Sequence, residues 1–147
     1  MNPEEFFEKE IMEVFGDESE GLLLPPPIFS TLPCEFTKFD KRTGVLEARF
    51  LVREGYLNPY GTVQGGILAG FADNTIGPLS MMIAKPNVTR RFEMKYSKPV
   101  TTEMEYVEVK ARLVSMEERK LHFSAEIRDP DGKLVARARA VHWLLKE

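Results

Sequence analysis

The segment Asn58-Pro-Tyr-Gly-Thr-Val-Gln64-Gly-Gly-Ile-Leu-Ala-Gly-Phe-Ala-Asp73 places a glycine pair before an apolar run that holds one carboxylate. The apolar run extends over residues 64–84 and predicts a buried helix. A helix that begins at Gly65 and Gly66 has free backbone N–H groups at the positive end of its dipole. A carboxylate among apolar residues is costly unless it is paired or used. The segment therefore predicts a site where a carbonyl oxygen is polarised and Asp73 is presented to it.

On both sides of this helix, apolar and polar residues alternate in the way that is typical of half-buried strands. We expect strands over residues 34–40, 44–52, 88–97, 104–116, 120–128 and 133–145. A plausible hairpin connection lies at residues 41–44, and Asp129-Pro130-Asp131-Gly132 is a strong turn signal. Because a helix that is apolar all round must be enclosed, we expect the antiparallel sheet to curl around it. This arrangement belongs to the α+β class.

The first part of the chain predicts one more helix. Residues 3–15 carry apolar side chains at helical spacing, and Pro3 suits a first turn. The connector that follows ends in Pro25-Pro26-Pro27, which we expect to be extended. Residues 1–33 are too few to hold a core of their own. We therefore interpret them as a helix and Pro-rich connector that pack on a single domain of residues 34–147, with a lid as the less favoured alternative.

Composition limits the classes of function. The 147 residues are 43% hydrophobic and 29% charged, as in one globular domain. A net charge of -3 argues against nonspecific nucleic-acid binding. The acidic start is unlike a signal peptide, and no uninterrupted apolar segment approaches 18 residues, so we expect a cytoplasmic protein without a membrane partner.

Few cysteine and histidine side chains are available for a metal site, and the motifs of several common hydrolase and nucleotide-binding classes are missing. Cys34 is the only cysteine, and His122 and His142 are the only histidines. We therefore expect no intrachain disulfide, no Cys- or His-based metal site and no cofactor. The sequence has no Gly-x-Ser-x-Gly elbow, no Gly-Lys-Ser/Thr phosphate loop and no His-Glu-x-x-His motif.

A longer pattern carries a family resemblance. Asn58, Gly61, Gln64-Gly65-Gly66 and Asp73 are followed by Val88-Thr89 and Tyr96-Ser97-Lys98-Pro99. This order, with the separations from Asn58 to Gln64 and on to Asp73, resembles the hotdog-fold acyl-CoA thioesterases, and within them the phenylacetic-acid-degradation type. The resemblance covers about residues 30–145. It implies a hotdog fold, in which a curved antiparallel sheet wraps a long central helix.

The resemblance also implies an activity: hydrolysis of an acyl-CoA thioester by a homodimer or homotetramer with active sites at the dimer interface. It assigns catalytic roles to Asp73, Gly66, Gln64 and Asn58, and substrate contacts to Gly65, Thr89 and Tyr96. Asp73 is then a nucleophile or general base, and a glycine N–H group polarises the thioester carbonyl. Thr89 matches a family Ser or Thr that assists the attacking water.

One position departs from the family, which usually has a histidine where this chain has Gln64. Glutamine donates and accepts hydrogen bonds but takes no proton at neutral pH. A non-catalytic acyl-CoA binding protein on the same scaffold is therefore the alternative to an enzyme. A hydratase or dehydratase of this fold is a third, disfavoured alternative, since we expect neither histidine to lie near the helix.

Simpler interpretations of the same residues stay open. Asp73 shares a helix face with small residues, which either leave room for a substrate or admit a packed neighbour. Asn58 also suits an ordinary turn before Pro59. The basic run formed by Arg90, Arg91, Lys95 and Lys98 either meets CoA phosphates or is a solvated strand face. We expect pocket depth to depend on Phe29, Phe36, Met81, Met82 and the N-terminal arm.

Overall fold

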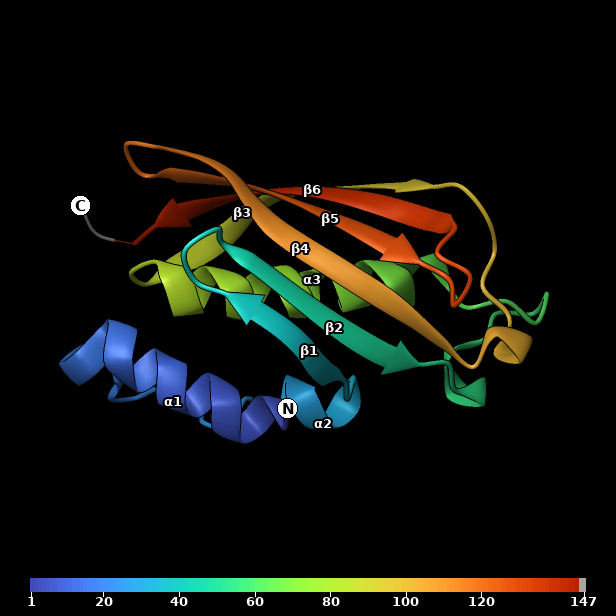
Figure 1. The fold of residues 1–147 in the computed structure, drawn as a ribbon, viewed down its shortest axis with the longest axis horizontal. Coiled ribbons are helices and arrows are strands. Elements are labelled where there is room, and N and C mark those ends of the chain that lie inside the picture. Colours follow the sequence, from blue (N-terminus) through green and yellow to red (C-terminus); the bar gives the residue numbers. More distant parts are fainter. Residues whose placement is uncertain (146–147) are drawn as a thin grey trace.

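The computed structural model describes residues 1–145, which form an α+β unit with helices on one side of a single sheet (Figure 1). The α-helices are α1 (Pro3–Phe15), α2 (Ile28–Thr31) and α3 (Gly65–Ile83). The strands are β1 (Glu35–Asp40), β2 (Val45–Leu51), β3 (Asn87–Tyr96), β4 (Tyr106–Glu117), β5 (Lys120–Arg128) and β6 (Leu134–Leu144). Short 3-10 turns lie at Gly16–Ser19, Glu54–Tyr56 and Thr102–Met104.

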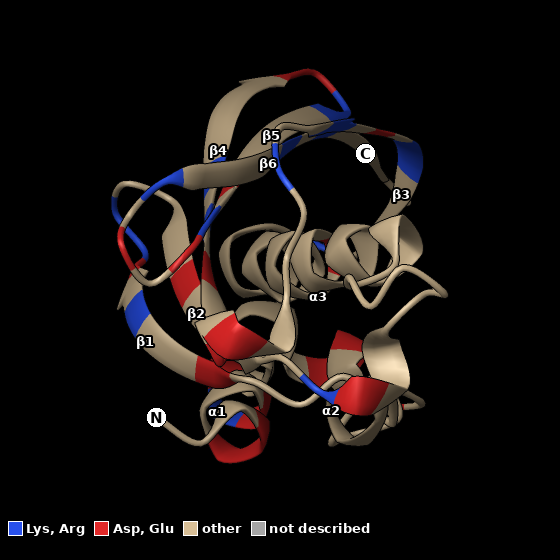
Figure 2. Cartoon of the chain, turned by 90° about the vertical axis from the view of Figure 1, so that its right-hand side faces the viewer, with Lys and Arg blue, Asp and Glu red and all other residues tan. Residues whose placement is uncertain are grey.

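The sheet is antiparallel throughout, with strand order β1-β2-β4-β5-β6-β3. Viewed end-on, it curves around α3, while α1 and α2 lie across the open side (Figure 2). Charged residues lie mainly on the strands and on α1, and α3 between them is almost uncharged. The expected hotdog arrangement, with a long central helix, a curved antiparallel sheet and an extra N-terminal helix, is confirmed.

Alternation along the strands produces the concave face of the sheet. On β5, Leu121, Phe123, Ala125 and Ile127 are buried, whereas the residues that alternate with them are at least partly accessible. On β4, Val107 and Val109 are buried in the same way. These side chains belong to one hydrophobic core that also includes α3. The alternating pattern therefore identified the face of the sheet that covers the helix.

The central helix buries most of its length in this core. Phe71, Ile76 and Leu79 are fully buried, and the ring of Phe71 stacks on Phe50 of β2 with centroids 4.4 Å apart. Asp73 lies on the exposed side of α3 and is the only charged residue of this 19-residue helix. The helix thus turns one polar group away from the core.

The N-terminal helix packs as part of the core. The Asn2 side chain accepts a hydrogen bond from the Glu4 N–H and caps α1, and Gly16 ends it with a φ of 54°. Phe7, Ile11 and Phe15 are among the buried core residues. The structure thus agrees with the interpretation of α1 as a packing arm, and the domain boundary at residue 33 stays a prediction.

The connector after α1 differs from the extended segment that we expected. Pro27 has helical dihedrals, and the Phe29 N–H donates to the carbonyl of Pro26, so the extended prediction is wrong for Pro27. Proline suits this place because it fixes φ near the helical value and the first turn needs no donor. The resulting short helix, α2, points Phe29 into the core.

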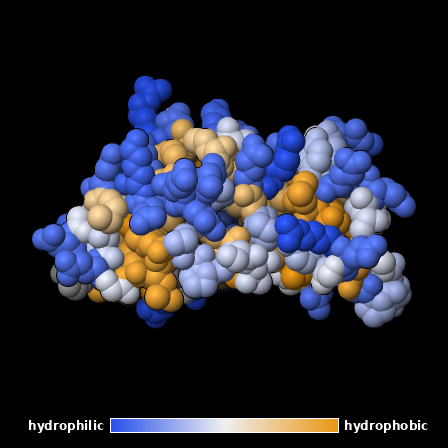
Figure 3. All heavy atoms as spheres, turned by 90° about the horizontal axis from the view of Figure 1, so that it is seen from below, coloured by the Kyte–Doolittle hydropathy of each residue, from blue (hydrophilic) through white to orange (hydrophobic). Residues whose placement is uncertain are grey.

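The connector is anchored on α3 by two contacts. The Asn74 side-chain amide donates to the carbonyl of Leu32 at 3.1 Å. A Cβ atom added to Gly70 would lie 2.9 Å from Leu32 Cδ1, so a larger residue here would displace the end of the Leu32 side chain. Seen from the side of α1 and α2, the surface is largely hydrophilic, with separate hydrophobic patches (Figure 3).

We expect Phe71→Ala to lower the free energy of unfolding by about 3–5 kcal/mol, because it removes a stacked ring from the core and leaves a cavity. Urea denaturation at fixed protein concentration measures this effect. Val114→Ala is the control, because Val114 is 58% exposed, and it should change stability by less than about 0.5 kcal/mol. Equal losses in the two variants would contradict this account of the core.

Candidate active site

The start of α3 presents two unpaired backbone donors. Gln64 is the N-cap, and its carbonyl accepts from the N–H groups of Ile67 and Leu68. Within residues 1–145, the N–H groups of Gly65 and Gly66 have no hydrogen-bond acceptor. Gly66 is exposed, and a Cβ atom built on it would meet nothing within 4 Å. Two donors at the positive end of a long helix are suited to bind an oxygen that carries negative charge.

Tyr96 of β3 holds this helix start in place. Its hydroxyl donates to the Gly65 carbonyl at 2.7 Å, and a Cβ atom at Gly65 would lie 3.2 Å from the tyrosine hydroxyl oxygen. Burial raises the pKa of Tyr96, so its hydroxyl keeps its proton. The structure therefore brings these two predicted substrate-contact residues together and shows Tyr96 fixing the glycine turn.

Asn58 closes the loop that leads to the helix. Its side-chain oxygen accepts from the N–H groups of Tyr60 at 3.0 Å and Thr62 at 3.2 Å, and its own N–H donates to the Thr62 carbonyl. This is the ordinary turn role that the sequence left open. A substrate contact by Asn58 stays a prediction. Gln64, which follows this loop, exposes its side chain and caps no helix donor.

Asp73 lines a pocket that α3 shares with β3 and the connector. The pocket has a volume of about 310 Å³, and Thr89 lies in its wall. Its other linings are mostly apolar and include Ile28, Phe29, Leu32, Gly77 and Met81. The Asp73 side chain is open to solvent on one side in the single chain, but the groups around it desolvate the carboxylate and raise its pKa. A carboxylate of this kind holds a proton more readily than an ordinary surface aspartate.

These features form two separate groups along the helix. Gly66 and Asp73 are seven residues apart on α3, which corresponds to about 10 Å along the helix axis. A carbonyl oxygen bound to the Gly66 N–H lies too far from Asp73 of the same helix for one reacting group to meet both. A site that uses both groups thus needs two copies of the helix.

Behind Thr89 lies a series of hydrogen bonds through His142 to Asn87 that the sequence did not predict. Thr89 Oγ1 lies 3.2 Å from His142 Nε2, and His142 Nδ1 lies 2.8 Å from Asn87 Oδ1. His142 is 2% exposed, and burial lowers its pKa to about 4. His142 does not line the Asp73 pocket itself, but its hydrogen bond to Thr89 connects it to the pocket wall. The antiparallel pairing of β3 with β6 creates this contact, because it places Thr89 opposite His142.

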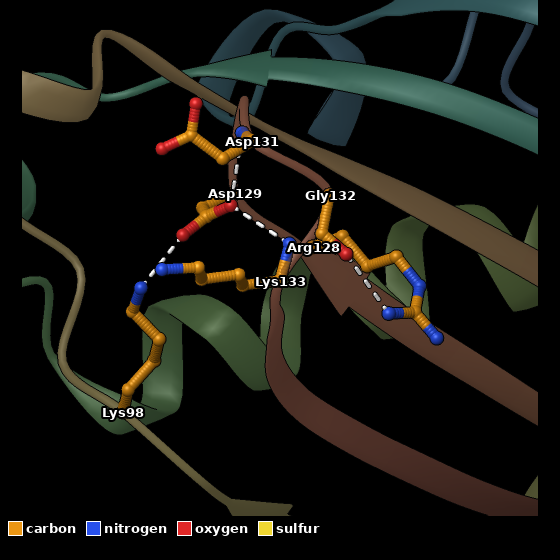
Figure 4. A network of polar contacts seen from close by, with 6 residues as sticks. All are labelled: Lys98, Arg128, Asp129, Asp131, Gly132 and Lys133. Carbon is orange, nitrogen blue, oxygen red and sulfur yellow. Dashed lines mark hydrogen bonds and ion pairs between the residues drawn. The ribbon is translucent and has the colours of Figure 1, made fainter.

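The basic run does not converge on one site. Lys98 pairs with Asp129 at 2.6 Å, and this contact joins the segment after β3 to the turn between β5 and β6 (Figure 4). Arg90 lies over the Trp143 ring at 5.2 Å from its centroid. Binding of CoA phosphates by this run stays a prediction, and Lys98 already has a partner.

Residues 1–145 show neither a cluster of metal ligands nor a helix that could span a membrane. Residues 1–145 contain no cluster of three or more His, Cys, Asp or Glu side chains that could hold a metal ion. None of the helices in the same range is long and apolar enough to cross a bilayer. Burial raises the pKa of Cys34 to about 12, so its thiol stays protonated.

Comparisons with known proteins agree with this fold. A family model described as the thioesterase superfamily matches residues 60–136, slightly more than half of the chain. A phenylacetic acid degradation-related protein from Ralstonia eutropha is 24% identical, with 95% of this chain and 99% of that chain covered and a TM-score of 0.78. A search of curated proteins found no match.

Two further solved structures are similar. The TT0310 protein from Thermus thermophilus is 26% identical, with 83% of this chain and 100% of that chain covered and a TM-score of 0.74. The PaaI protein from the phenylacetic acid degradation operon of Escherichia coli is 16% identical, with 82% and 86% covered and a TM-score of 0.75. The match to the thioesterase superfamily confirms the resemblance to thioesterases, and the structures of the phenylacetic-acid-degradation proteins share the fold of this chain.

We expect Asp73→Asn and Asp129→Asn to shift the thermal midpoint at pH 7 in opposite directions. The folded-state pKa of Asp73 is raised, so its ionised form costs stability above that pKa, and Asp73→Asn should raise the midpoint. The pKa of Asp129 is lowered by the hydrogen bond from Lys98, so its stabilising effect is present at neutral pH, and Asp129→Asn should lower the midpoint.

Thermal unfolding from pH 7 down to pH 3 measures both shifts. The gain from Asp73→Asn should disappear as the pH falls through the raised pKa, and the loss from Asp129→Asn should disappear as the pH falls through the lowered one. A carboxyl-carbon NMR titration checks the order directly. A pKa of Asp73 at or below that of Asp129 would show that this account of the pocket is wrong.

Proposed function

Because the chain belongs to the thioesterase superfamily, we propose that it is an acyl-CoA thioesterase that hydrolyses a small or medium acyl- or aryl-CoA. The observation that carries the proposal is the pair of free N–H groups at Gly65 and Gly66 on the same helix as the lone carboxylate of Asp73. Helix N–H donors stabilise the oxyanion that forms when a thioester carbonyl is attacked. The carboxylate supplies a nucleophile or a general base.

The active unit in this proposal is a homodimer, or a homotetramer built from such dimers. One chain binds the thioester carbonyl at its Gly66 N–H, and Asp73 of a second chain approaches the carbonyl carbon. The separation of about 10 Å between these groups within one helix supports this division. Gly66 and Gly77 support it too, because both face open space where a second chain and the substrate can approach.

The chemistry is a hydrolysis in which one water molecule is consumed. As a general base, Asp73 takes a proton from water while the water oxygen bonds to the carbonyl carbon. The C–S bond then breaks, the CoA sulfur receives the proton, and the acyl group leaves as a carboxylic acid. As a nucleophile, Asp73 instead attacks the carbonyl carbon, the C–S bond breaks and the CoA thiolate leaves. Water then hydrolyses the resulting acyl–carboxylate anhydride to the acid in a second step, with the released proton going to the CoA sulfur.

The acyl group fits the pocket beside Asp73. Its volume of about 310 Å³ and its apolar wall support a small or medium acyl or aryl group. Phe29 and Met81 line it, as expected from the sequence. Phe36 and Met82 do not, because both are fully buried in the core.

One observation favours the alternative, a protein that binds acyl-CoA without hydrolysing it. Gln64 stands where the family usually has a histidine, and its side chain is exposed and caps no helix donor. A site that lacks one polar participant can hold a thioester without turning it over. Binding and turnover must therefore be measured separately.

We expect the purified protein to hydrolyse at least one member of an acyl- and aryl-CoA panel, with release of CoA followed by a thiol reagent. Asp73→Asn should lower kcat by about 10²–10⁴-fold, because the reaction loses its base or nucleophile. Asp131→Asn is the matched control, since Asp131 is an exposed turn residue outside the pocket, and its kcat should equal that of the wild type.

Two results would oppose the proposal. One is the absence of turnover across the panel, and the other is turnover that Asp73→Asn leaves intact. If turnover is present, a single turnover in ¹⁸O-labelled water tests the nucleophilic role of Asp73. Isotope found in the Asp73 carboxylate indicates a nucleophile, because water has then hydrolysed the anhydride at the Asp73 carbonyl, whereas isotope found only in the product acid means that water attacked the substrate acyl carbon.

Gln64 variants test the alternative. If Gln64 only orients substrate or water, Gln64→Ala should lower kcat by about tenfold, and Gln64→His should keep most of the activity. Calorimetric Kd values for a non-hydrolysable thioester analogue accompany these rates. Tight binding with negligible hydrolysis in the wild type, unchanged in Gln64→His, would favour the binding protein.

A further inference from the structure

We propose that His142 is a positioning residue, which holds the Thr89 hydroxyl as a hydrogen-bond acceptor for the water that attacks the thioester. The inference rests on the proposed function for the identity of the reaction. It concerns three residues, Asn87, His142 and Thr89, which form a line of hydrogen bonds from the protein interior to the pocket. Neither of the two hydrogen bonds that join these residues involves Asp73 or the glycine turn.

The direction of every hydrogen bond in the line follows from Asn87. Its side-chain amide donates to the carbonyls of Lys85 at 2.9 Å and Ser80 at 3.3 Å. The oxygen of Asn87 therefore faces His142 Nδ1, and because this oxygen only accepts, Nδ1 must carry the proton. A neutral imidazole that is protonated on Nδ1 has a lone pair on Nε2.

The imidazole is neutral because it is buried. Its ring contacts Phe123 edge to face, with centroids 5.0 Å apart, and burial keeps its pKa at about 4. Nε2 is thus an acceptor at neutral pH, and the Thr89 hydroxyl donates its only proton to it. Both ring nitrogens have partners, so the buried polar ring is satisfied.

This leaves only lone pairs of the Thr89 oxygen for the pocket. An attacking water needs its own lone pair directed at the carbonyl carbon, so both of its protons should be donated elsewhere. Asp73 and Thr89 line the same pocket and offer one acceptor each. A hydroxyl without His142 can instead donate to the water and engage the lone pair that must attack. His142 prevents that arrangement.

The backbone keeps the line rigid. Thr89 and His142 are paired across β3 and β6, and Leu121 of β5 is paired with His142 on the other side. A register shift follows Thr89, so that Arg91 pairs with Val141 and Arg90 is left out of the pairing. The irregularity begins next to the pocket, where bulges commonly re-aim a side chain.

Substitutions at Thr89 and His142 test the inference. Thr89→Val removes the acceptor. His142→Asn keeps a donor toward Asn87 but removes the acceptor for Thr89, whereas the longer His142→Gln keeps an acceptor near the place of Nε2. We expect Thr89→Val and His142→Asn each to lower kcat by about tenfold with KM changed less than about twofold. Thr89→Ser and His142→Gln should recover most of that loss.

The double variant supplies the decisive measurement. If His142 acts through Thr89, Thr89→Val with His142→Asn should lose about tenfold in kcat, not about a hundredfold. His122→Asn is the matched histidine control, since His122 of β5 lies outside the Asp73 pocket, and it should leave kcat unchanged. Additive losses, or a His142→Asn variant with wild-type kcat, would overturn the inference.

A second measurement is independent of activity. Long-range ¹⁵N NMR of the imidazoles should show His142 as the neutral tautomer protonated on Nδ1 at pH 6–7, and Thr89→Val should shift the Nε2 signal. The opposite tautomer would overturn the inference whether or not the protein is an enzyme. If the tautomer is as expected but no thioester is hydrolysed, the proposed function fails, and the catalytic part of the inference fails with it.

Discussion

The enclosure of α3 is the constraint on which the rest of the structure depends. A helix this apolar is stable in water only when other elements cover it, and here the curved sheet covers one side while α1 and α2 cover another. The stacked rings of Phe71 and Phe50 lie in this contact. With the helix held in this way, its first turn and its exposed side are fixed in position relative to β3. Both parts of the candidate site use that fixed geometry.

The candidate site divides its tasks between elements of different kinds. A helix terminus supplies backbone donors, which need no side chain and are oriented by Tyr96. In the proposed reaction, a carboxylate on the middle of the same helix supplies the base or nucleophile, and it carries the cost of desolvation. A strand supplies Thr89, whose hydroxyl is oriented from behind by His142. Preorganised groups of this kind need little rearrangement when charge develops on the substrate.

The sequence was sufficient to predict where the strands and the long helix lie along the chain, because alternation and apolar runs are local signals. It also predicted the glycine turn and the lone Asp73, since both are contiguous with the helix. It could not predict the contact between Thr89 and His142, which are 53 residues apart and meet through strand pairing beside a register shift. Nor could it predict the helical Pro27, which depends on how the connector meets α3.

The attachment of the connector to α3 through Leu32 and Asn74 has a consequence for how this protein can diverge. The pocket wall at Ile28 belongs to a segment outside the sheet, and this side chain is exposed, so changes there alter neither a strand register nor the core. The glycine turn and Asp73 belong to α3, most of whose side chains are buried in the core, where substitutions are costly. If the proposed reaction holds, selection for a new acyl group can therefore act on the exposed part of the connector while the helix that carries these groups is inherited unchanged.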